Sequence, residues 1–278
     1  MKAMASGYVR AKDLPQAVSL LAQAGGEARP IAGGQSLVAT MNLGLTGELG
    51  LIDIGGLEEL RGIRVEGDRL IIGALTRHAE LASDALIARH SLLLAQAAPL
   101  IAHAAIRSRG TIGGSLAHAD PAAELPACVL ALGGVIHATG PSGEREIAAE
   151  EFFEDVFATA LADDEILTAV SVPLRQTYEH HDIRELARRS GDYALAGLAL
   201  VVRGGAHRLA CFGCGSTPIL AQGAMAALDK GDIDGAVAAL ADDLDPPSDT
   251  QGSRVYRLHL AGVLLRRAIA DAKGESDV

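Results

Sequence analysis

The chain has 278 residues, 49% of them hydrophobic, and a formal net charge of −11. Nucleic acids and anionic membrane surfaces attract basic proteins, so this charge argues against both as partners. Three cysteines do not suggest a disulfide scaffold. The first residues lack the unbroken apolar core of a secretory signal, and no apolar run is long enough to span a bilayer. We therefore expect a cytoplasmic protein with reduced thiols and no membrane insertion.

Residues 1–55 show a strand–helix–strand pattern. Asp13 and Gln16 form a capping box, which predicts a helix from Asp13 to Ala24 that ends at a Gly-Gly pair. Short apolar strands are expected at 29–31 and 49–54. The pattern indicates a small α/β lobe.

Residues 56–176 indicate a second lobe of helices and mostly antiparallel strands. Helices are expected from Thr76 to about Arg89 and from Ser91 to Ala102, and Pro99 should kink or end the second one. A hairpin is expected around the Gly-Asp dipeptide at 67–68. The strands of this lobe are expected at 62–65, 69–73, 135–139, 144–148 and 165–172.

A third domain, residues 177–278, follows a charged stretch at 175–182 that we interpret as a domain boundary. Within that stretch, His180 and His181 are expected to form a solvated pair in an exposed connector. The elements expected beyond it are strands at 195–202 and 207–213 and helices at about 219–229, 233–241 and 253–273.

Residues 109–126, RGTIGGSLAHADPAAELP, combine a glycine pair with a helix start. Asp120 is a candidate N-cap, Pro121 suits the first helical position, and Glu124 falls in the first turn. A Gly-Gly pair at 133–134 should end this helix. The preceding residues 111–115 are interpreted as a glycine loop. Successive backbone N–H groups of such a loop can form a concave anion site, which hydroxyl groups in the loop would complete.

A second glycine pair occurs in IAGGQSL at residues 31–37, again with a hydroxyl residue two places on. One Gly-Gly pair is ordinary turn punctuation. Two polar, uncharged glycine loops can close on one phosphorylated ligand from two sides. They would hold a diphosphate mainly through N–H and O–H groups rather than through lysine.

Other constellations favour structural roles. Cys211 and Cys214 form a C-x-x-C pair, but Cys128 is the one further thiol, so an iron–sulfur cluster within this chain is not expected. We interpret the pair as core cysteines. His118, Asp120 and Glu124 resemble metal ligands, but Asp120 is expected as a cap, so we expect no metal site. Pro218 stands where a dinucleotide-binding fingerprint needs its third glycine, which excludes a Rossmann reading.

AGGQSL at 32–37 and RGTIGGSLAHADPAAELPA at 109–127 together resemble the FAD-binding (medium) subunit of molybdenum hydroxylases, the group of carbon monoxide dehydrogenase and xanthine dehydrogenase. ARRSGDYALAG at 187–197 resembles the start of that family's C-terminal domain, and the resemblance extends over essentially the whole chain. It implies an α+β fold. A two-lobed FAD-binding domain would precede a C-terminal domain with a three-stranded antiparallel sheet and a helical bundle.

The resemblance also implies which residues bind FAD. Those expected around the diphosphate and ribityl groups are Ala32, Gly33, Gly34, Gln35, Ser36, Thr111, Gly113, Gly114 and Ser115. Ala117 and Asp120 belong to the same motif, and Glu124 is expected to accept a ribityl or ribose hydroxyl. Ile166 and Leu167 match a strand on the adenine side. Gln35 and Ser115 differ from the His and the Asn or Asp of some relatives, but both keep hydrogen-bonding capacity.

Tyr193 matches an aromatic residue near the isoalloxazine ring in the family. It lies in a dense polar group with Arg188, Arg189 and Asp192. Two interpretations stay open for this group: a salt-bridge network at the domain interface, or charges that hold the seam while the tyrosine ring lies beside a flavin.

The resemblance implies an electron-transfer role without acid–base catalysis in this chain. A large molybdenum subunit would oxidise the substrate and a small subunit with [2Fe-2S] clusters would relay electrons. The FAD would pass them to an external acceptor. A heterotrimer that dimerises is expected. The alternatives are a stand-alone two-lobed FAD oxidoreductase and a scaffold subunit that has lost FAD. Substrate and electron acceptor stay open.

Overall fold

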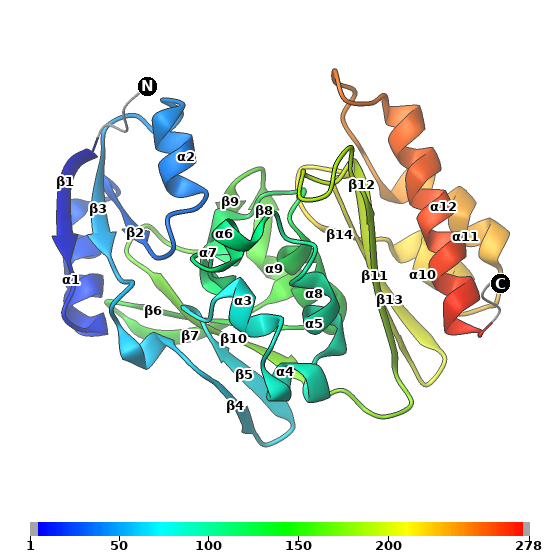
Figure 1. Ribbon diagram of the computed structural model, residues 1–278, viewed down its shortest axis with the longest axis horizontal. Coiled ribbons are helices and arrows are strands. Elements are labelled where there is room, and N and C mark those ends of the chain that lie inside the picture. The colour runs from blue at the N-terminus through cyan, green and yellow to red at the C-terminus, as the bar shows by residue number, and fades with distance from the viewer. Residues whose placement is uncertain (1–4, 275–278) are drawn as a thin grey trace.

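The computed structural model describes residues 5–274, which form three consecutive parts that lie side by side (Figure 1). The first part lies at one end, the second in the middle, and the third at the other end, with its helices on the outside. This order agrees with the α+β architecture that the family resemblance implied.

The first lobe contains a parallel sheet in the order β1-β3-β2, built from Ala5–Arg10, Leu49–Asp53 and Ala28–Ile31. Helix α1 (Leu14–Ala24) packs against it, and α2 (Leu37–Asn42) follows β2. The Asp13 carboxylate accepts the Gln16 N–H at 2.8 Å, so the predicted cap is confirmed. Strand β1 was not predicted, because all six of its residues are exposed and show no alternation.

The second lobe contains a five-stranded antiparallel sheet in the order β4-β5-β10-β6-β7. Its strands are β4 (Ile63–Glu66), β5 (Arg69–Gly73), β10 (Ile166–Pro173), β6 (Val135–Gly140) and β7 (Gly143–Ala148). The short elements around it are η1 (Glu58–Leu60), α9 (Ala149–Phe152), β8 (Phe153–Asp155) and β9 (Ala158–Thr159). The antiparallel strands and the hairpin at 67–68 are as predicted.

The two long helices expected at 76–89 and 91–102 are wrong in extent. The chain instead forms α3 (His78–Leu81), α4 (Ala85–His90), α5 (Leu92–Ala97) and α6 (Ala104–Arg107). The break between α3 and α4 comes from Asp84, whose carboxylate accepts the N–H groups of Leu86 and Ile87 and so caps a new helix. Helix α5 ends before Pro99.

The C-terminal domain has an antiparallel sheet in the order β11-β12-β13-β14. The three long strands are β11 (His180–Leu186), β12 (Ala196–Arg203) and β13 (Ala206–Phe212), and β14 (Ile219–Leu220) adds two residues. Helices α10 (Gln222–Leu228), α11 (Ile233–Asp243) and α12 (Arg254–Ala272) cover the outer face (Figure 1). None of the helices in residues 5–274 combines the length and apolarity needed to cross a bilayer.

The expectation of an exposed connector with a solvated His180–His181 pair is wrong. Both residues lie in β11, and His181 is buried with 3% exposure. Its Nδ1 accepts the Leu93 N–H at 3.3 Å, and its Nε2 lies 3.1 Å from the buried Glu179 carboxylate. Arg203 Nε donates to the same carboxylate at 2.7 Å. This polar cluster therefore ties α5 of the second lobe to the C-terminal sheet.

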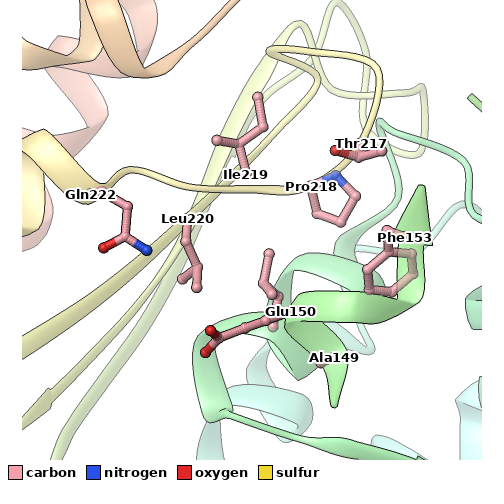
Figure 2. Close-up of a pocket in the computed structure, with 9 residues that line it drawn as sticks. Ala149, Glu150, Phe153, Thr217, Pro218, Ile219, Leu220 and Gln222 are labelled. Atoms are coloured by element: carbon pink, nitrogen blue, oxygen red, sulfur yellow. The ribbon is translucent and has the colours of Figure 1, made fainter. Parts of the chain in front are cut away.

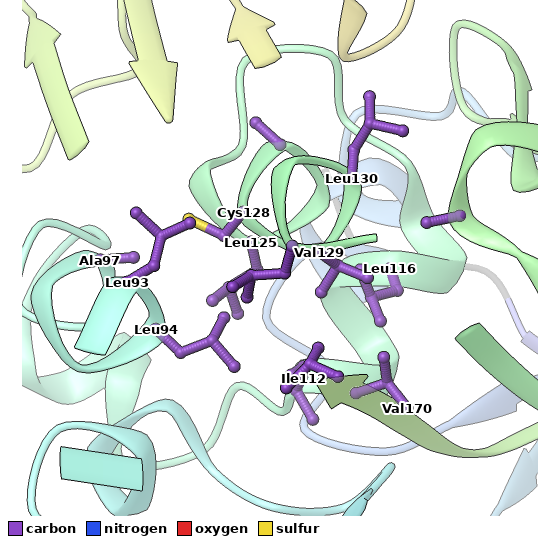
Figure 3. Close-up of a cluster of buried hydrophobic side chains, with 14 of the residues drawn as sticks. Leu93, Leu94, Ala97, Ile112, Leu116, Leu125, Cys128, Val129, Leu130 and Val170 are labelled. Carbon is purple, nitrogen blue, oxygen red and sulfur yellow. The ribbon is translucent and has the colours of Figure 1, made fainter. Parts of the chain in front are cut away.

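The C-terminal sheet shares its core with the second lobe. Alternate side chains, including Ala199, Val201 and Phe212, face the core of that lobe, whereas Leu198 and Leu200 face α10–α12. Helix α8 (Glu124–Leu132) lies between the two layers, and every side chain from 125 to 132 is buried. Figure 3 shows its apolar residues packed against those of α5 and of α7 (Ile112–His118). All three cysteines are free and buried, as expected of core cysteines.

Candidate functional site

The two glycine motifs meet. A Cβ added to Gly33 would lie 2.0 Å from the Arg109 carbonyl oxygen and 3.0 Å from Gly110 Cα. Real Cβ atoms do not approach backbone so closely, so only glycine fits at position 33. The loop after β2 therefore contacts the segment that leads into the second motif, as the two-sided ligand site required.

The first motif presents free backbone donors. It follows the carboxyl end of β2, an edge where ligands commonly bind in α/β sheets. Gly34 has a φ of +69°, which turns the loop sharply. Within the described chain, the N–H groups of residues 33–36 have no hydrogen-bond acceptor, and the Ser36 hydroxyl caps no helix N–H. Gln35 Nε2 donates to the Gly33 carbonyl at 2.9 Å. These donors suit an anion.

The second motif is a helix, not the predicted glycine loop. Helix α7 (Ile112–His118) starts directly after Thr111, whose Oγ1 accepts the Gly114 N–H at 3.1 Å. The backbone N–H groups of residues 112–115 all have acceptors within the protein, namely oxygens of Thr76, Ala74 and Thr111. The predicted concave anion site at this motif is therefore wrong, because capping and tertiary hydrogen bonds use its N–H groups.

Helix α7 offers a small-residue face instead. Gly113 is buried, and a Cβ there would lie 2.6 Å from the Ala74 Cβ. Gly114 and Ala117, three residues apart on the same face, are exposed, and Ser115 is half-buried between them. A Cβ on Gly114 would meet a single neighbour within 4 Å, the Thr111 hydroxyl at 2.9 Å. A ligand can therefore approach the helix backbone closely at Gly114.

Asp120 does not cap the following helix as predicted. Its Oδ1 accepts the Ala122 N–H at 2.9 Å, which closes an Asx turn, and helix α8 begins at Glu124 after the cap position Ala123. Ala119, with a φ of +50°, ends α7 just before this turn. Glu124 in the first turn and the helix end at Gly133, with a φ of +65°, are as predicted.

Two half-buried carboxyl groups, Glu124 at the start of α8 and Glu185 in β11, lie near Cys128. Burial, with smaller contributions from the charges of Glu185 and Asp120, raises the pKa of Glu124 to about 7. Burial also raises the pKa of Glu185 to about 7, and Glu185 Oε2 has no hydrogen-bond partner within residues 5–274. Burial and both carboxylates raise the pKa of the Cys128 thiol. Burial therefore favours the protonated form of both carboxyl groups.

Tyr193 reaches this region from the C-terminal domain. Its residue is 66% exposed, yet partial desolvation and the charges of Asp120 and Glu124 raise the pKa of its phenol to about 12. The ring therefore lies beside the turn between α7 and α8. Arg188 donates to the carbonyls of Thr250 and Gln251. In the described residues, Arg188, Arg189 and Asp192 form no ion pair, so the salt-bridge alternative for this group is absent there.

Ile166 and Leu167 have enclosed side chains. Ile166 is 1% exposed in the core of the first lobe, and Leu167 is 5% exposed in the core of the second. Strand β10 thereby bridges the two lobes. The structure does not bring these two side chains to the open face of α7.

Of two surface cavities, one lies away from the expected site residues and one borders them. One of about 300 Å³ separates the second lobe from β14 and is lined by Glu150, Phe153 and Pro218 among others (Figure 2). It contains none of the expected site residues. One of about 210 Å³ lies beside Tyr193 and Pro121. No group of three metal-binding side chains occurs in the part of the chain that the structure describes.

Sequence reasoning missed His78 and Gly110. His78 is 6% exposed, and its backbone N–H donates to the Gly110 carbonyl at 3.0 Å. Arg77 and Thr111 form an isolated antiparallel bridge beside it. Nothing in the sequence near His78 resembles a site motif, and the pairing joins segments more than thirty residues apart.

Comparison with known proteins places the chain in a family. Residues 3–175 match the FAD binding domain in molybdopterin dehydrogenase, and residues 181–272 match the CO dehydrogenase flavoprotein C-terminal domain. The carbon monoxide dehydrogenase medium chain of Afipia carboxidovorans is 39% identical, with 97% of each chain covered. The 6-hydroxypseudooxynicotine dehydrogenase complex subunit alpha of Paenarthrobacter nicotinovorans is 38% identical, over 98% of this chain and 96% of that one.

Solved structures of related enzymes have the same fold as this chain. A chain of carbon monoxide dehydrogenase from Hydrogenophaga pseudoflava superposes with a TM-score of 0.95 at 35% identity, covering 100% of both chains. A chain of quinoline 2-oxidoreductase from Pseudomonas putida 86 superposes with a TM-score of 0.91 at 33% identity, covering 99% of each. The chain therefore belongs to the family of FAD-binding medium subunits of molybdenum hydroxylases, and it is an oxidoreductase subunit.

Proposed function

We propose that this chain carries FAD as the electron-transfer subunit of a molybdenum hydroxylase. It would accept electrons from an iron–sulfur subunit and pass them to an external acceptor. Bound FAD supplies the redox chemistry, and the protein fixes and tunes it. The substrate would be oxidised on a partner chain, so the residues of this chain have no hydrolytic or acid–base task.

The observation that carries the proposal is the junction of Gly33 with Arg109 and Gly110. On one side of the junction lie the free N–H groups of residues 33–36, and on the other lies the open face of α7 at Gly114. An elongated diphosphate-containing cofactor needs both features: donors for its charge and a surface without side chains for close approach.

The proposed contacts follow from this geometry. The N–H groups after Ala32 and the Ser36 hydroxyl would hold the diphosphate. The proposed contacts from the second lobe are Thr111, Gly113, Gly114, Ser115 and Ala117. Asp120 and Glu124 would accept cofactor hydroxyl groups, and Tyr193 would lie near the isoalloxazine ring. Ile166 and Leu167, whose side chains are enclosed, would act on the adenine side by supporting the strand.

The partners proposed are a small subunit with [2Fe-2S] clusters and a large subunit with the molybdenum cofactor, in a heterotrimer that dimerises. The relatives support this, since they are named as medium chains or subunits of dehydrogenases. Soluble expression and co-purification with iron and molybdenum would test it.

Gly114→Val is expected to abolish flavin binding, because its side chain would fill the open face of α7. The matched control is Gly7→Val on exposed β1, where an added Cβ meets no atom within 4 Å. The measurement is the absorption spectrum of each purified full chain, with identification of the released cofactor. We expect FAD from the wild type and the control, and none from the Gly114 variant.

Other outcomes distinguish the alternatives. Full flavin retention by the Gly114 variant would overturn the site assignment. Flavin reduction by an organic substrate without partner subunits would favour a stand-alone oxidoreductase. A folded, colourless wild-type chain that takes up no added FAD would indicate a scaffold.

A further inference from the structure

His78 is a buried imidazole that the proposed site does not use. It starts α3, is 6% exposed, and its ring nitrogens make no hydrogen bond of ordinary geometry within residues 5–274, although the Thr111 backbone lies close enough to influence its pKa. A buried polar group without a partner costs free energy, so such a group needs an explanation. His78 lies in the segment that holds the second glycine motif.

The segment 74–78 supports residues 110–113 by backbone hydrogen bonds. Ile112 donates to Thr76 and Gly113 donates to Ala74, at 3.0 and 2.9 Å. At the other end, His78 N–H donates to the Gly110 carbonyl at 3.0 Å. These bonds fix the backbone of residues 110–113 against the segment 74–78.

A second contact with Gly110 comes from the His78 imidazole. A Cβ on Gly110 would lie 2.9 Å from His78 Cε1 and 3.0 Å from His78 Nδ1, so the ring lies against the Gly110 backbone. A Cβ on Gly33 would lie 3.0 Å from Gly110 Cα. His78, Gly110 and Gly33 therefore form a continuous stack from the second lobe to the free donors of the first.

The surroundings of His78 disfavour a positive charge. Burial lowers the pKa of its imidazole to about 4, the Thr111 backbone opposes that shift, and Arg107 on α6 adds to it. Arg77 and Glu80 on its own turn are exposed, and the Glu80 carboxylate accepts the Arg77 N–H at 2.6 Å. Arg109 on the facing segment is also exposed. No carboxylate therefore compensates a charged His78.

We propose that His78 is a positioning residue for the cofactor site: its ring presses on Gly110 and so sets the spacing between the two glycine motifs. This inference rests on the proposed FAD site. Protonation of the ring would place an unpaired charge in the stack and would separate the motifs.

The first test is a double-mutant cycle on FAD affinity, measured by flavin fluorescence on the full chain. His78→Ala and Gly110→Ala are each expected to raise the Kd about tenfold, because one removes the ring and the other collides with it. In the double variant the collision with the ring is gone and only a 3.2 Å contact with the Ile106 carbonyl oxygen remains, so its Kd should be no higher than that of Gly110→Ala. The control is His259→Ala, exposed on α12.

The second test is the pH profile of FAD affinity. His78→Gln cannot take up a proton. It should bind FAD like the wild type near pH 7 and lose less affinity than the wild type as the pH falls toward about 4. Thermal unfolding without FAD reports whether each variant is folded.

Two results would overturn the inference. One is a double variant whose increase in Kd equals the product of the two single increases, which would mean that His78 and Gly110 act independently. The other is a His78→Gln variant whose FAD affinity falls with pH as the wild type's does. A wild-type chain that binds no FAD would instead remove the proposed function. A variant that does not fold is excluded by the thermal measurement, and the Gln variant then decides the question.

Discussion

At the scale of single residues, the two glycine motifs differ although their sequences look alike. The free N–H groups of residues 33–36 exist because this segment is the turn between β2 and α2, where its N–H groups precede the first helical hydrogen bonds and pair with no strand. Thr111 removes the same groups from the second motif by capping α7. We expect the charged part of the cofactor to depend mainly on the first motif.

A second residue-scale feature is the Glu124–Glu185 pair. Ionising Glu185 in the folded state is unfavourable, since burial raises its pKa from 4.5 to about 7. The folded chain therefore binds more protons than the unfolded chain between these values, and stability falls as the pH rises through this window. Above about pH 7, Glu185 is ionised in both states, so the free energy of unfolding falls no further on account of this group.

Glu185→Gln should therefore stabilise the chain at pH 8 but not at pH 5. Because Gln cannot ionise, we expect the unfolding temperature at pH 8 to rise by roughly 2–4 °C. Differential scanning calorimetry at both pH values measures it, with Glu144→Gln on exposed β7 as the control. An equal rise at both pH values would contradict the ionisation argument.

At the scale of elements, helix α8 is held at both ends by the C-terminal domain. Gly213 N–H donates to the Pro121 carbonyl at 2.8 Å, just before the helix. At its other end, Arg208 donates to the carbonyls of Ala131 and Leu130 at 3.0 and 2.9 Å and pairs with Glu150. A guanidinium at the last carbonyls also complements the helix dipole.

Arg208→Met should destabilise the chain by about 1.5–3 kcal/mol, because it removes charge-assisted hydrogen bonds from partly buried carbonyls. Chemical denaturation measures the effect. The control is Arg266→Met, since the Arg266–Asp234 pair is exposed on both sides. If both variants lose the same small amount of unfolding free energy, Arg208 does not act as a cap of α8.

The sequence predicted elements with strong local signals. The Asp13 cap, the hairpin at 67–68 and the apolar helix ending at Gly133 were correct because each depends on neighbouring residues. The features that the sequence analysis got wrong or missed depend on contacts between residues far apart in the sequence. The use of the second motif's N–H groups by Thr76 and Ala74, the burial of His181 under α5, and the contact of His78 with Gly110 join segments with no local signature.

At the scale of the whole molecule, the predicted domain limits do not separate independent cores. Phe212 and Val201 of the C-terminal sheet belong to the same apolar cluster as Leu94 and Val129 of the second lobe. The C-terminal sheet thus packs against the second lobe on one face and against α10–α12 on the other. Removing this sheet would expose α8 along its length.

A chain ending at residue 176 should therefore not fold as a soluble FAD module. We expect aggregation or strong binding of a hydrophobic dye, with no flavin uptake, because α8 loses the strands that cover it. The full-length chain, expressed in parallel, is the control. A monomeric truncated chain with bound FAD would contradict the shared core.

The contacts of the C-terminal domain with both ends of α8 also have a consequence for biosynthesis. The ribosome completes this apolar helix well before it synthesises Arg208 and Gly213, the residues that close both ends. The nascent chain must shield α8 during that interval, and Tyr193 reaches the turn beside it only late in translation. We therefore expect FAD loading and subunit assembly to follow completion of the chain, so flavin supplied during translation should give no advantage over flavin supplied afterwards.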